Sequence, residues 1–238
     1  MKQDFQLKHI GFTLAEVLIT LGIIGVVAAL TLPALINNTN KKELETAFKK
    51  QYSILQQAVM TIKNEDDLEF NYANYGYNSG NTRFGTRLAE QFQTTQDCGE
   101  INNNTGCVLN NEDGEFTYYK TLNGNTLSRV YFDDGGFIAP DGTIFFIEQG
   151  SQVRDTGGFI VSIDVNGYKK RPNKMGYDLF MFQITKDGRV LPMGADGTTW
   201  GKESDRISKC DKNSKNSDNG YTCAYYALTD TNYFKNLY

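Results

Sequence analysis

The sequence predicts an α+β protein in which a long N-terminal helix packs on an antiparallel β-sheet. Two observations lead to this prediction. Helix-type apolar spacing covers residues 12–63, whereas runs of β-branched and aromatic residues separated by turn sequences begin only near residue 115. Helices that precede the strands, instead of alternating with them, are typical of the α+β class. The 238 residues are enough for one globular domain and an extended element.

The helix begins with a run that is long enough to cross a lipid bilayer. Residues 17–36 contain no charged side chain, and a transmembrane helix needs about 20 apolar residues. The run is too long for a secretory signal peptide, and no small-residue cleavage site follows it. Lys2 and Lys8 favour a cytoplasmic N-terminus, with the rest of the chain across the membrane. Lys41 and Lys42 on the far side weaken this charge asymmetry.

One carboxylate, that of Glu16, lies at the start of this run. A carboxylate within the hydrocarbon layer is costly, although less so near the interface, and therefore needs a partner. The next basic residue is Lys41, which lies outside the run. If the chain were cut just before Phe12, the new α-amino group could neutralise Glu16, either in the same chain or in a neighbouring copy.

These residues resemble those of a known family. Residues 11–33, GFTLAEVLITLGIIGVVAALTLP, are similar to the N-terminal signature of type IV pilins and type II secretion pseudopilins, in which a basic leader ends in Gly before Phe-Thr-Leu-x-Glu. The resemblance implies that a prepilin peptidase cuts between Gly11 and Phe12 and methylates the amino group of Phe12. It also implies that Glu16 sets the register of an assembling filament by pairing with Phe12 of an adjacent subunit.

The resemblance further implies a function, a location and partners. The expected function is that of a structural subunit of a type II secretion pseudopilus or a type IV pilus-like filament. Before assembly the chain would cross the cytoplasmic (inner) membrane once, with an extracytoplasmic head. The expected partners are the prepilin peptidase, other pilin or pseudopilin subunits and the inner-membrane assembly platform. The alternative is a membrane-anchored extracytoplasmic binding module that never polymerises.

The chain divides into three parts on this basis. Residues 1–11 form the cleaved leader, residues 12–63 form a helix that is hydrophobic first and amphipathic later, and residues 64–238 form a pilin-like head with a C-terminal disulfide loop. The amphipathic half carries apolar residues at intervals of three, four or seven: Leu44, Phe48, Leu55, Val59 and Ile62. This spacing predicts that one face of the helix packs on the head.

Strand signals dominate the later part of the head. Residues 64–85 predict an irregular connection with one helical turn, and a short helix is expected over residues 86–92. Five β-branched and aromatic runs follow: EFTYYKTL (115–122), LSRVYF (127–132), GFIAPDGTIFFIEQ (136–149), GGFIVSIDV (157–165) and YDLFMFQITKDGRVLPM (177–193). Two of these runs contain tight hairpin turns, at Pro140-Asp141-Gly142 and Lys186-Asp187-Gly188, which predict antiparallel pairing.

Four cysteines form two local pairs. Cys98 and Cys107 flank one short polar loop, and Cys210 and Cys223 flank another. An even number of cysteines beyond a membrane segment favours two disulfides in an oxidising compartment. The alternatives are free thiols or a Cys-only metal site, and neither pair has the CxxC spacing that such a site usually shows.

Residues 163–180, IDVNGYKKRPNKMGYDLF, carry a candidate calcium site. Asp164, Asn166, Asn173 and Asp178 are gathered around two glycines, and calcium binds carboxylate and amide oxygens on bent loops. Four basic residues in the same segment oppose a dication unless they point outward. Because only two carboxylates are present, a loop of Asx turns, in which Asp and Asn bond their own backbone, is the favoured interpretation.

Composition argues against two broad classes of function. The chain has 24 Lys and Arg against 28 Asp and Glu and no long basic block, so nucleic-acid binding is not expected. The single histidine, His9, lies in the leader, which leaves the remaining chain without the usual general base or zinc ligand. No phosphate-binding loop, dinucleotide fingerprint or paired-carboxylate motif stands out. We therefore do not expect an enzyme.

Overall fold

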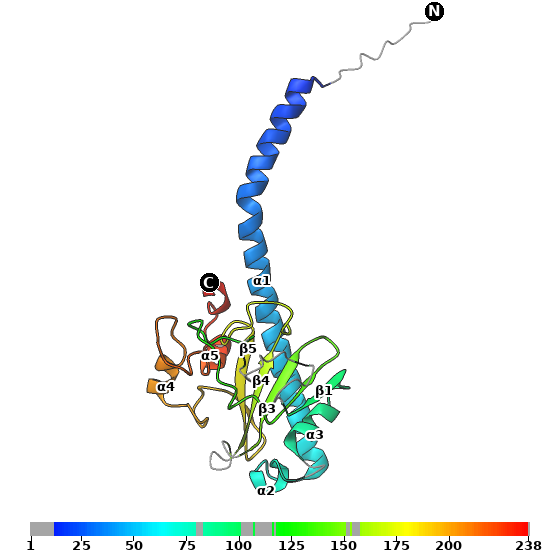
Figure 1. Ribbon diagram of the computed structural model, residues 1–238, viewed down its shortest axis with the longest axis vertical. Coiled ribbons are helices and arrows are strands. Elements are labelled where there is room, and N and C mark those ends of the chain that lie inside the picture. The colour runs from blue at the N-terminus through cyan, green and yellow to red at the C-terminus, as the bar shows by residue number, and fades with distance from the viewer. Residues whose placement is uncertain are drawn as a thin grey trace, which may run out of the picture. The chain divides into compact units, whose positions relative to one another are not determined.

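The computed structural model describes residues 12–79, 83–100, 107, 116, 118–150, 153 and 158–237. The chain forms two compact units, of which the first ends at Lys41 and the second, called the head below, extends from Lys42 to Tyr238. Helix α1, Leu14–Asp66, contributes to both units. In the head, α1 packs on a six-stranded antiparallel sheet, as Figure 1 shows, so the predicted α+β class is confirmed.

The sheet is a simple meander in which each strand pairs with the next one along the chain. Its strands are β1 (Gln96–Gly99), β2 (Gly135–Ile138), β3 (Ile144–Glu148), β4 (Gly158–Asp164), β5 (Leu179–Thr185) and β6 (Val190–Pro192). The predicted Pro140-Asp141-Gly142 turn joins β2 to β3, and the predicted Lys186-Asp187-Gly188 turn joins β5 to β6. Gly142 and Gly188 have φ values of 87° and 80°, a left-handed conformation that favours glycine.

The second half of α1 covers one face of the sheet (Figure 1). Phe48 is fully buried, and its ring centroid lies 4.4 Å from that of Phe180 in β5. One turn later, the ring of Tyr52 stacks on Phe182 at 5.3 Å. Because residues two apart in a strand point to the same side, Phe180 and Phe182 form one continuous contact with the helix. The predicted amphipathic face of the helix is therefore buried on the sheet.

Two short helices extend this layer. They are α2 (Tyr72–Tyr75) and α3 (Phe84–Glu90), and the second of them begins two residues before the helix predicted at 86–92. Arg87 ties α3 to the end of α1, because its guanidinium Nη2 lies 2.7 Å from the Asp66 carboxylate. The hydroxyl of Tyr75 also donates to Asp66, at 2.9 Å.

The predicted strands at 115–122 and 127–132 are wrong. In the described residues of these two segments only isolated bridge pairs occur, which join Lys120 to Thr126 and to Lys174. The segments are therefore irregular chain rather than members of the sheet.

Aromatic residues from these segments cover the second face of the sheet instead. Phe146 of β3 points to this face, and the ring centroids of Phe116, Tyr119 and Phe132 lie 5.4, 5.4 and 6.0 Å from it. All four side chains are buried. These aromatic residues are therefore buried because they pack on the sheet, although they do not form strands themselves. Composition alone does not distinguish these two situations.

The C-terminal region contributes to the cover of both faces, because Phe234 packs on Phe180 on the α1 side and Thr199 bonds Gln183 on the other side. It contains α4 (Glu203–Ser208), α5 (Cys223–Thr229) and the 3₁₀ helix η2 (Phe234–Asn236), none of which was predicted. Gln183 of β5 accepts hydrogen bonds from the backbone N–H and the hydroxyl of Thr199, at 2.7 and 3.0 Å. The buried side chain of Gln183 on the second face therefore finds its partners in the irregular chain that covers this face.

Candidate functional site

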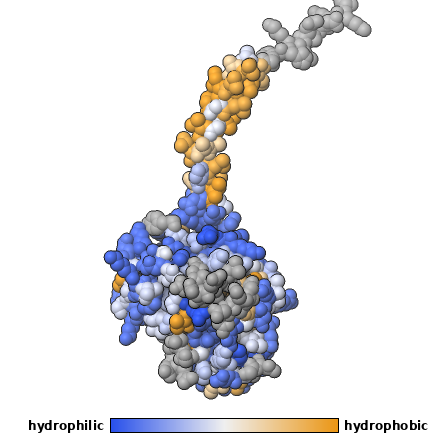
Figure 2. All heavy atoms as spheres, in the orientation of Figure 1, coloured by the Kyte–Doolittle hydropathy of each residue, from blue (hydrophilic) through white to orange (hydrophobic). Residues whose placement is uncertain are grey.

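The first half of α1 is long and apolar enough to span a membrane. An 18-residue window of this helix has a mean hydropathy of 2.4, and none of the window is buried in the protein. Figure 2 shows this part of α1 as a largely hydrophobic surface and the visible face of the head as mainly hydrophilic. Within the described part of the chain, this is the one helix that meets the length and composition of a membrane span.

The side chain of Glu16 folds back onto the start of this helix. Its Oε2 accepts hydrogen bonds from the backbone N–H of Thr13 at 2.8 Å and from the Thr13 hydroxyl at 2.7 Å. The Thr13 hydroxyl in turn accepts from the N–H of Glu16 at 3.3 Å. This is a capping box, in which Thr13 is the N-cap and Glu16 the third helical residue. Sequence reasoning missed this role, although a Thr-x-x-Glu pattern before an apolar run predicts it.

The remaining N-terminal site residues have simple environments. The side chain of Phe12 is 88% exposed. Gly11 lies outside the described residues, so the proposed cleavage point is not seen directly. Glu16 forms no ion pair with any residue of the described chain, and the described hydrogen bonds of its side chain are both with Thr13. The charge of Glu16 is thus not neutralised within the single chain.

The apolar half of α1 satisfies its own polar groups. The hydroxyls of Thr20, Thr31 and Thr39 each donate to a backbone carbonyl one turn earlier, at 2.9 to 3.0 Å. Such internal bonds are what a helix in lipid requires, because lipid offers no partner to an exposed hydroxyl. Pro33 lies inside the helix and cannot donate a backbone hydrogen bond at that point.

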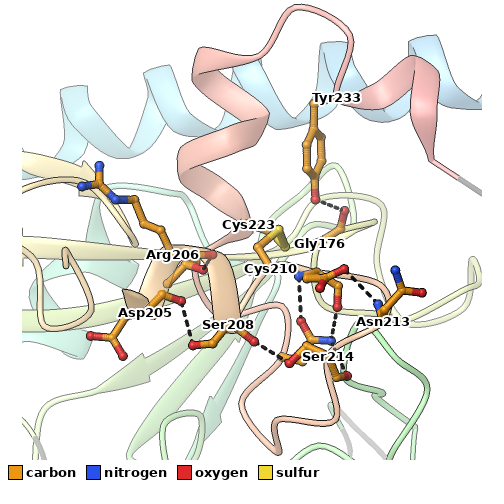
Figure 3. Close-up of a disulfide and its surroundings, with 12 residues drawn as sticks. Gly176, Asp205, Arg206, Ser208, Cys210, Asn213, Ser214, Cys223 and Tyr233 are labelled. Atoms are coloured by element: carbon orange, nitrogen blue, oxygen red, sulfur yellow. Dashed lines mark hydrogen bonds between the residues drawn. A yellow bond between two sulfur atoms is a disulfide. The ribbon is translucent and has the colours of Figure 1, made fainter. Parts of the chain in front are cut away.

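Both predicted disulfides are present. Cys98 and Cys107 have Cα atoms 5.6 Å apart, and Cys210 and Cys223 have Cα atoms 5.1 Å apart. The second bridge lies beside Gly176 of the β4–β5 loop, as Figure 3 shows. A Cβ at Gly176 would lie 2.9 Å from the sulfur of Cys223, so this close contact requires glycine.

A hydrogen bond joins the C-terminal segment, at Tyr233, to the same β4–β5 loop. The hydroxyl of Tyr233 donates to the backbone oxygen of Gly176 at 2.7 Å (Figure 3). Phe234, the next residue, is buried, with its ring centroid 5.6 Å from that of Phe48 in α1. The β4–β5 loop therefore joins the disulfide region to the core of the head.

The β4–β5 loop also brings together the candidate calcium ligands. Oδ1 of Asp164 accepts from the backbone N–H of Gly167 at 2.9 Å, and Oδ2 accepts from the hydroxyl of Tyr119 at 2.6 Å. Oδ2 of Asp178 accepts from the backbone N–H of Asn173 at 2.8 Å. The Asx-type backbone bonding expected from the sequence is thus present in the loop.

Both carboxylates of this loop are fully buried. Burial raises the pKa of Asp164, and the nearby charge of Asp178 raises it further. Burial likewise raises the pKa of Asp178, against the effect of backbone hydrogen bonds from Lys174 and Asn173. In the part of the chain that the structure describes, neither carboxylate forms an ion pair with Lys or Arg. A pair of buried acids without a counter-charge is an energetically costly arrangement.

A second acidic cluster was not predicted. Asp133, Asp134 and Glu148 each place a carboxylate oxygen within 4.8 Å of the others. Burial raises the pKa of Glu148 to about 9, and the hydrogen bond and charge of Asp134 contribute to the rise. Oδ2 of Asp134 also accepts from the backbone N–H of Gln149 at 2.9 Å. The favoured state of this cluster at neutral pH keeps a proton on Glu148.

Comparisons of the chain with family models, with curated proteins and with solved structures find no match. What the chain does is therefore inferred from its own residues. Of the predicted site residues, the structure gathers the four loop residues, the two cysteine pairs, and Glu16 with its capping partner. It provides no counter-charge for Glu16 or for the buried acids of the β4–β5 loop among the described residues.

Proposed function

We propose that this chain is a structural subunit of a filament of the type II secretion pseudopilus or type IV pilus kind. A prepilin peptidase removes residues 1–11 and methylates the new N-terminal amine at Phe12. The processed chain spans the inner membrane once, with its N-terminus in the cytoplasm and its head outside. The assembly platform of the inner membrane then moves it into a filament with copies or relatives.

The observation that supports this proposal most directly is the uncompensated Glu16. Its carboxylate lies at the start of an apolar helix and has no basic partner among the described residues. The amine of Phe12 on a neighbouring subunit would supply the missing positive charge. Because each chain offers one acid and one amine at different positions, the pairing is head-to-tail, and such a contact builds an open helical filament when the rotation between subunits does not close a ring.

The exposed surface of α1 agrees with assembly through this helix. Large apolar side chains between Leu14 and Ile36 are exposed in the single chain, with exposed fractions of 41 to 79%. In a membrane, lipid covers such a surface, and in a filament the helices of neighbouring subunits cover it. The second half of α1 is already packed on the sheet, so the first half is the part left for packing between subunits.

The alternative function, a membrane-anchored binding module, is favoured by one observation. A cavity of about 460 Å³ lies beside the Cys210–Cys223 bridge, which is within the size range of small-molecule sites. Its wall includes Lys174, Tyr177 and Leu237. Such a module needs an anchor but has no use for an acid at position 16, so substitution of Glu16 separates the two functions.

The decisive experiment uses the full chain expressed with a prepilin peptidase and the assembly machinery. Intact-mass analysis should find residues 1–11 removed and one methyl group added at Phe12. Glu16→Gln should insert and be cleaved normally but fail to enter filaments. Glutamine can replace glutamate in a capping box, so this variant removes the charge while it keeps the helix cap.

The matched control is Glu43→Gln, which removes an exposed carboxylate from α1 beyond the apolar run. This variant should enter filaments like the unsubstituted chain. A working protein that still begins at Met1 would contradict the processing step. Normal filament entry of Glu16→Gln would contradict the pairing of Glu16 with Phe12. Absence of the unsubstituted chain from filaments would favour the binding module.

A further inference from the structure

We propose that the exposed tip of the β4–β5 loop, formed by Lys169, Lys170 and Arg171, binds anionic phospholipid headgroups at the surface of the membrane that α1 enters. Lys42, at the start of the head, belongs to the same basic surface. The inference uses only the membrane span and the head. It therefore applies to a filament subunit before assembly and equally to an anchored binding module.

The first argument is that the three cations of the loop tip have no partner of opposite charge. Lys169, Lys170 and Arg171 follow one another in the chain, and all three are exposed. None of them forms an ion pair with a described residue, whereas seven other Lys and Arg side chains are paired with carboxylates. Adjacent like charges repel one another, so an anionic partner would stabilise this tip.

The second argument is that the loop holds these cations on a well-bonded base. The buried carboxylate of Asp178 accepts the backbone N–H groups of Asn173 and Lys174, at 2.8 and 2.6 Å. Lys120 donates its backbone N–H to the carbonyl of Asn173 at 2.9 Å. The buried acid is thus engaged by the backbone and leaves the exposed cations free for another partner. A base that is already ordered also lowers the entropy cost of binding.

The third argument is the place of the loop within the head. Lys50 of α1 contacts Asp141 of the β2–β3 turn, with the ammonium nitrogen 2.7 Å from the carboxylate. A Cβ at Gly167 would lie 2.5 Å from the carbonyl oxygen of Gly142, so the β4–β5 loop lies beside that turn. The β5–β6 turn contacts α1 near its other end instead, through Lys63. The basic tip therefore belongs to the end of the head at which α1 enters.

The chain keeps this end of the head close to the membrane. The apolar run ends at Ile36 and the head begins at Lys42, so only residues 37–41 separate them. Even a fully extended segment of this length spans only about 17 Å. Lys42 is exposed and forms no ion pair with a described residue, so it adds a fourth cation at this end. Clusters of four to eight Lys or Arg beside a membrane helix are typical of surfaces that bind anionic lipids.

The opposite end of the head carries charge of the opposite sign. Glu65, Asp67 and Glu69 are exposed where α1 ends. An anionic membrane surface attracts the basic end and repels the acidic end, so it favours one orientation of the head. Nucleic acid offers similar phosphate groups, but nothing holds it beside this end of the chain. The acidic end of a second copy is the other candidate partner, and the test below separates it from lipid.

The test uses the full chain in nanodiscs that hold one copy each, made of phosphatidylcholine alone or with about one quarter phosphatidylglycerol. An uncharged reagent acetylates exposed lysines, and mass spectrometry measures the rate at each position. Lys169 and Lys170 should react at least about fivefold more slowly in the anionic discs, since each cation near such a surface contributes a factor of roughly five. Lys186 in the β5–β6 turn should react equally in both discs. Salt at about 0.5 M should remove the difference, because it screens the surface charge.

Two double variants, each of which removes two exposed cations, complete the test. In Lys170→Gln/Arg171→Gln, Lys169 should lose most of its protection in the anionic discs. In the matched control Lys186→Gln/Arg189→Gln, Lys169 should stay protected.

Three results would overturn the proposal. The first is equal acetylation of Lys169 in the two kinds of disc, and the second is a protection that Lys186 shares. The third is a Lys170→Gln/Arg171→Gln variant that keeps its protection but fails to enter filaments, which would assign the loop to contact with a second copy. Protection of Lys169 by duplex DNA in phosphatidylcholine discs, without any effect of phosphatidylglycerol, would likewise replace lipid by nucleic acid. None of these measurements involves the prepilin peptidase, so they do not depend on the processing of Phe12.

Discussion

Truncation of Phe48 to alanine should be the most damaging single change at the contact between α1 and the sheet. The Phe48 ring is 0% exposed and lies 4.4 Å from Phe180, 5.9 Å from Phe182 and 5.6 Å from Phe234, measured between ring centroids. Replacing a buried Phe by Ala costs about 3–5 kcal/mol, out of a total stability of about 5–15 kcal/mol for a typical domain. At about 2–4 °C per kcal/mol, the melting temperature should fall by about 6–20 °C.

The assay is thermal unfolding of the full chain in detergent, followed by near-ultraviolet circular dichroism. This signal reports aromatic packing in the head and is insensitive to helix retained within the micelle. The matched control is Met60→Ala on the same helix, where the side chain is 62% exposed and the change should stay within about 0.5 kcal/mol. If Phe48→Ala and Met60→Ala had the same melting temperature, the helix would not be packed on the sheet as described.

Three further predictions test other parts of the head. Replacing Cys210 and Cys223 together by Ser should cost about 3 kcal/mol, because their bridge closes a loop with a sequence separation of 13, and an unchanged midpoint in urea would contradict this. Gly158→Ala should sharply lower the melting temperature, because its Cβ would lie 1.9 Å from the carbonyl oxygen of Ile184, and normal thermal unfolding would show that β4 and β5 are not paired in this way. The raised pKa of Glu148, about 9 against an ordinary 4.5, implies stability that is present below about pH 4.5 and lost as the pH rises towards 9. Glu148→Gln should flatten that part of the stability profile, as measured by urea midpoints across this range, whereas an unchanged slope would show that Glu148 ionises normally.

Hairpin turns made part of the sheet predictable. The Pro140-Asp141-Gly142 turn determines where the chain reverses, and the observed register pairs Ile138 with Ile144 across it. Carrying the same register outward pairs Gly135 with Ile147, which brings Asp134 next to Glu148. The acidic cluster could therefore have been found from the sequence by counting outward from the turn.

Tertiary contacts determine the conformation of the segments that were not predicted correctly. Strand β1, with the sequence QDCG, has little strand propensity of its own and forms because it lies at the edge of β2. Residues 127–132 have the composition of a strand, yet their Phe132 packs on the second face of the sheet. Composition reports that a segment will be buried on a pleated surface, but it does not say whether the segment joins that surface or covers it.

Glu16 shows how one residue can satisfy two independent constraints. The capping box with Thr13 explains why a glutamate is compatible with the start of this helix, and loss of such a cap typically costs about 1 kcal/mol. It does not explain the charge, because glutamine would serve as well at that position. The charge needs a partner that the single chain does not provide among its described residues. Comparison of Glu16→Gln with Glu16→Ala therefore separates the cap from the pairing.

The β4–β5 loop shows that a sequence can predict a turn without predicting how deeply that turn is buried. At an exposed site, Asx turns need nothing further, because water hydrogen-bonds any amide oxygen that the backbone leaves over. The sequence could name Asp164 and Asn173, but not Tyr119, which reaches Asp164 from 45 residues away and helps to bury the loop. In the buried loop, the side-chain oxygen of Asn173 has no hydrogen-bond donor among the described residues. The depth of the loop, rather than the identity of its residues, thus makes its remaining polar atoms costly to bury.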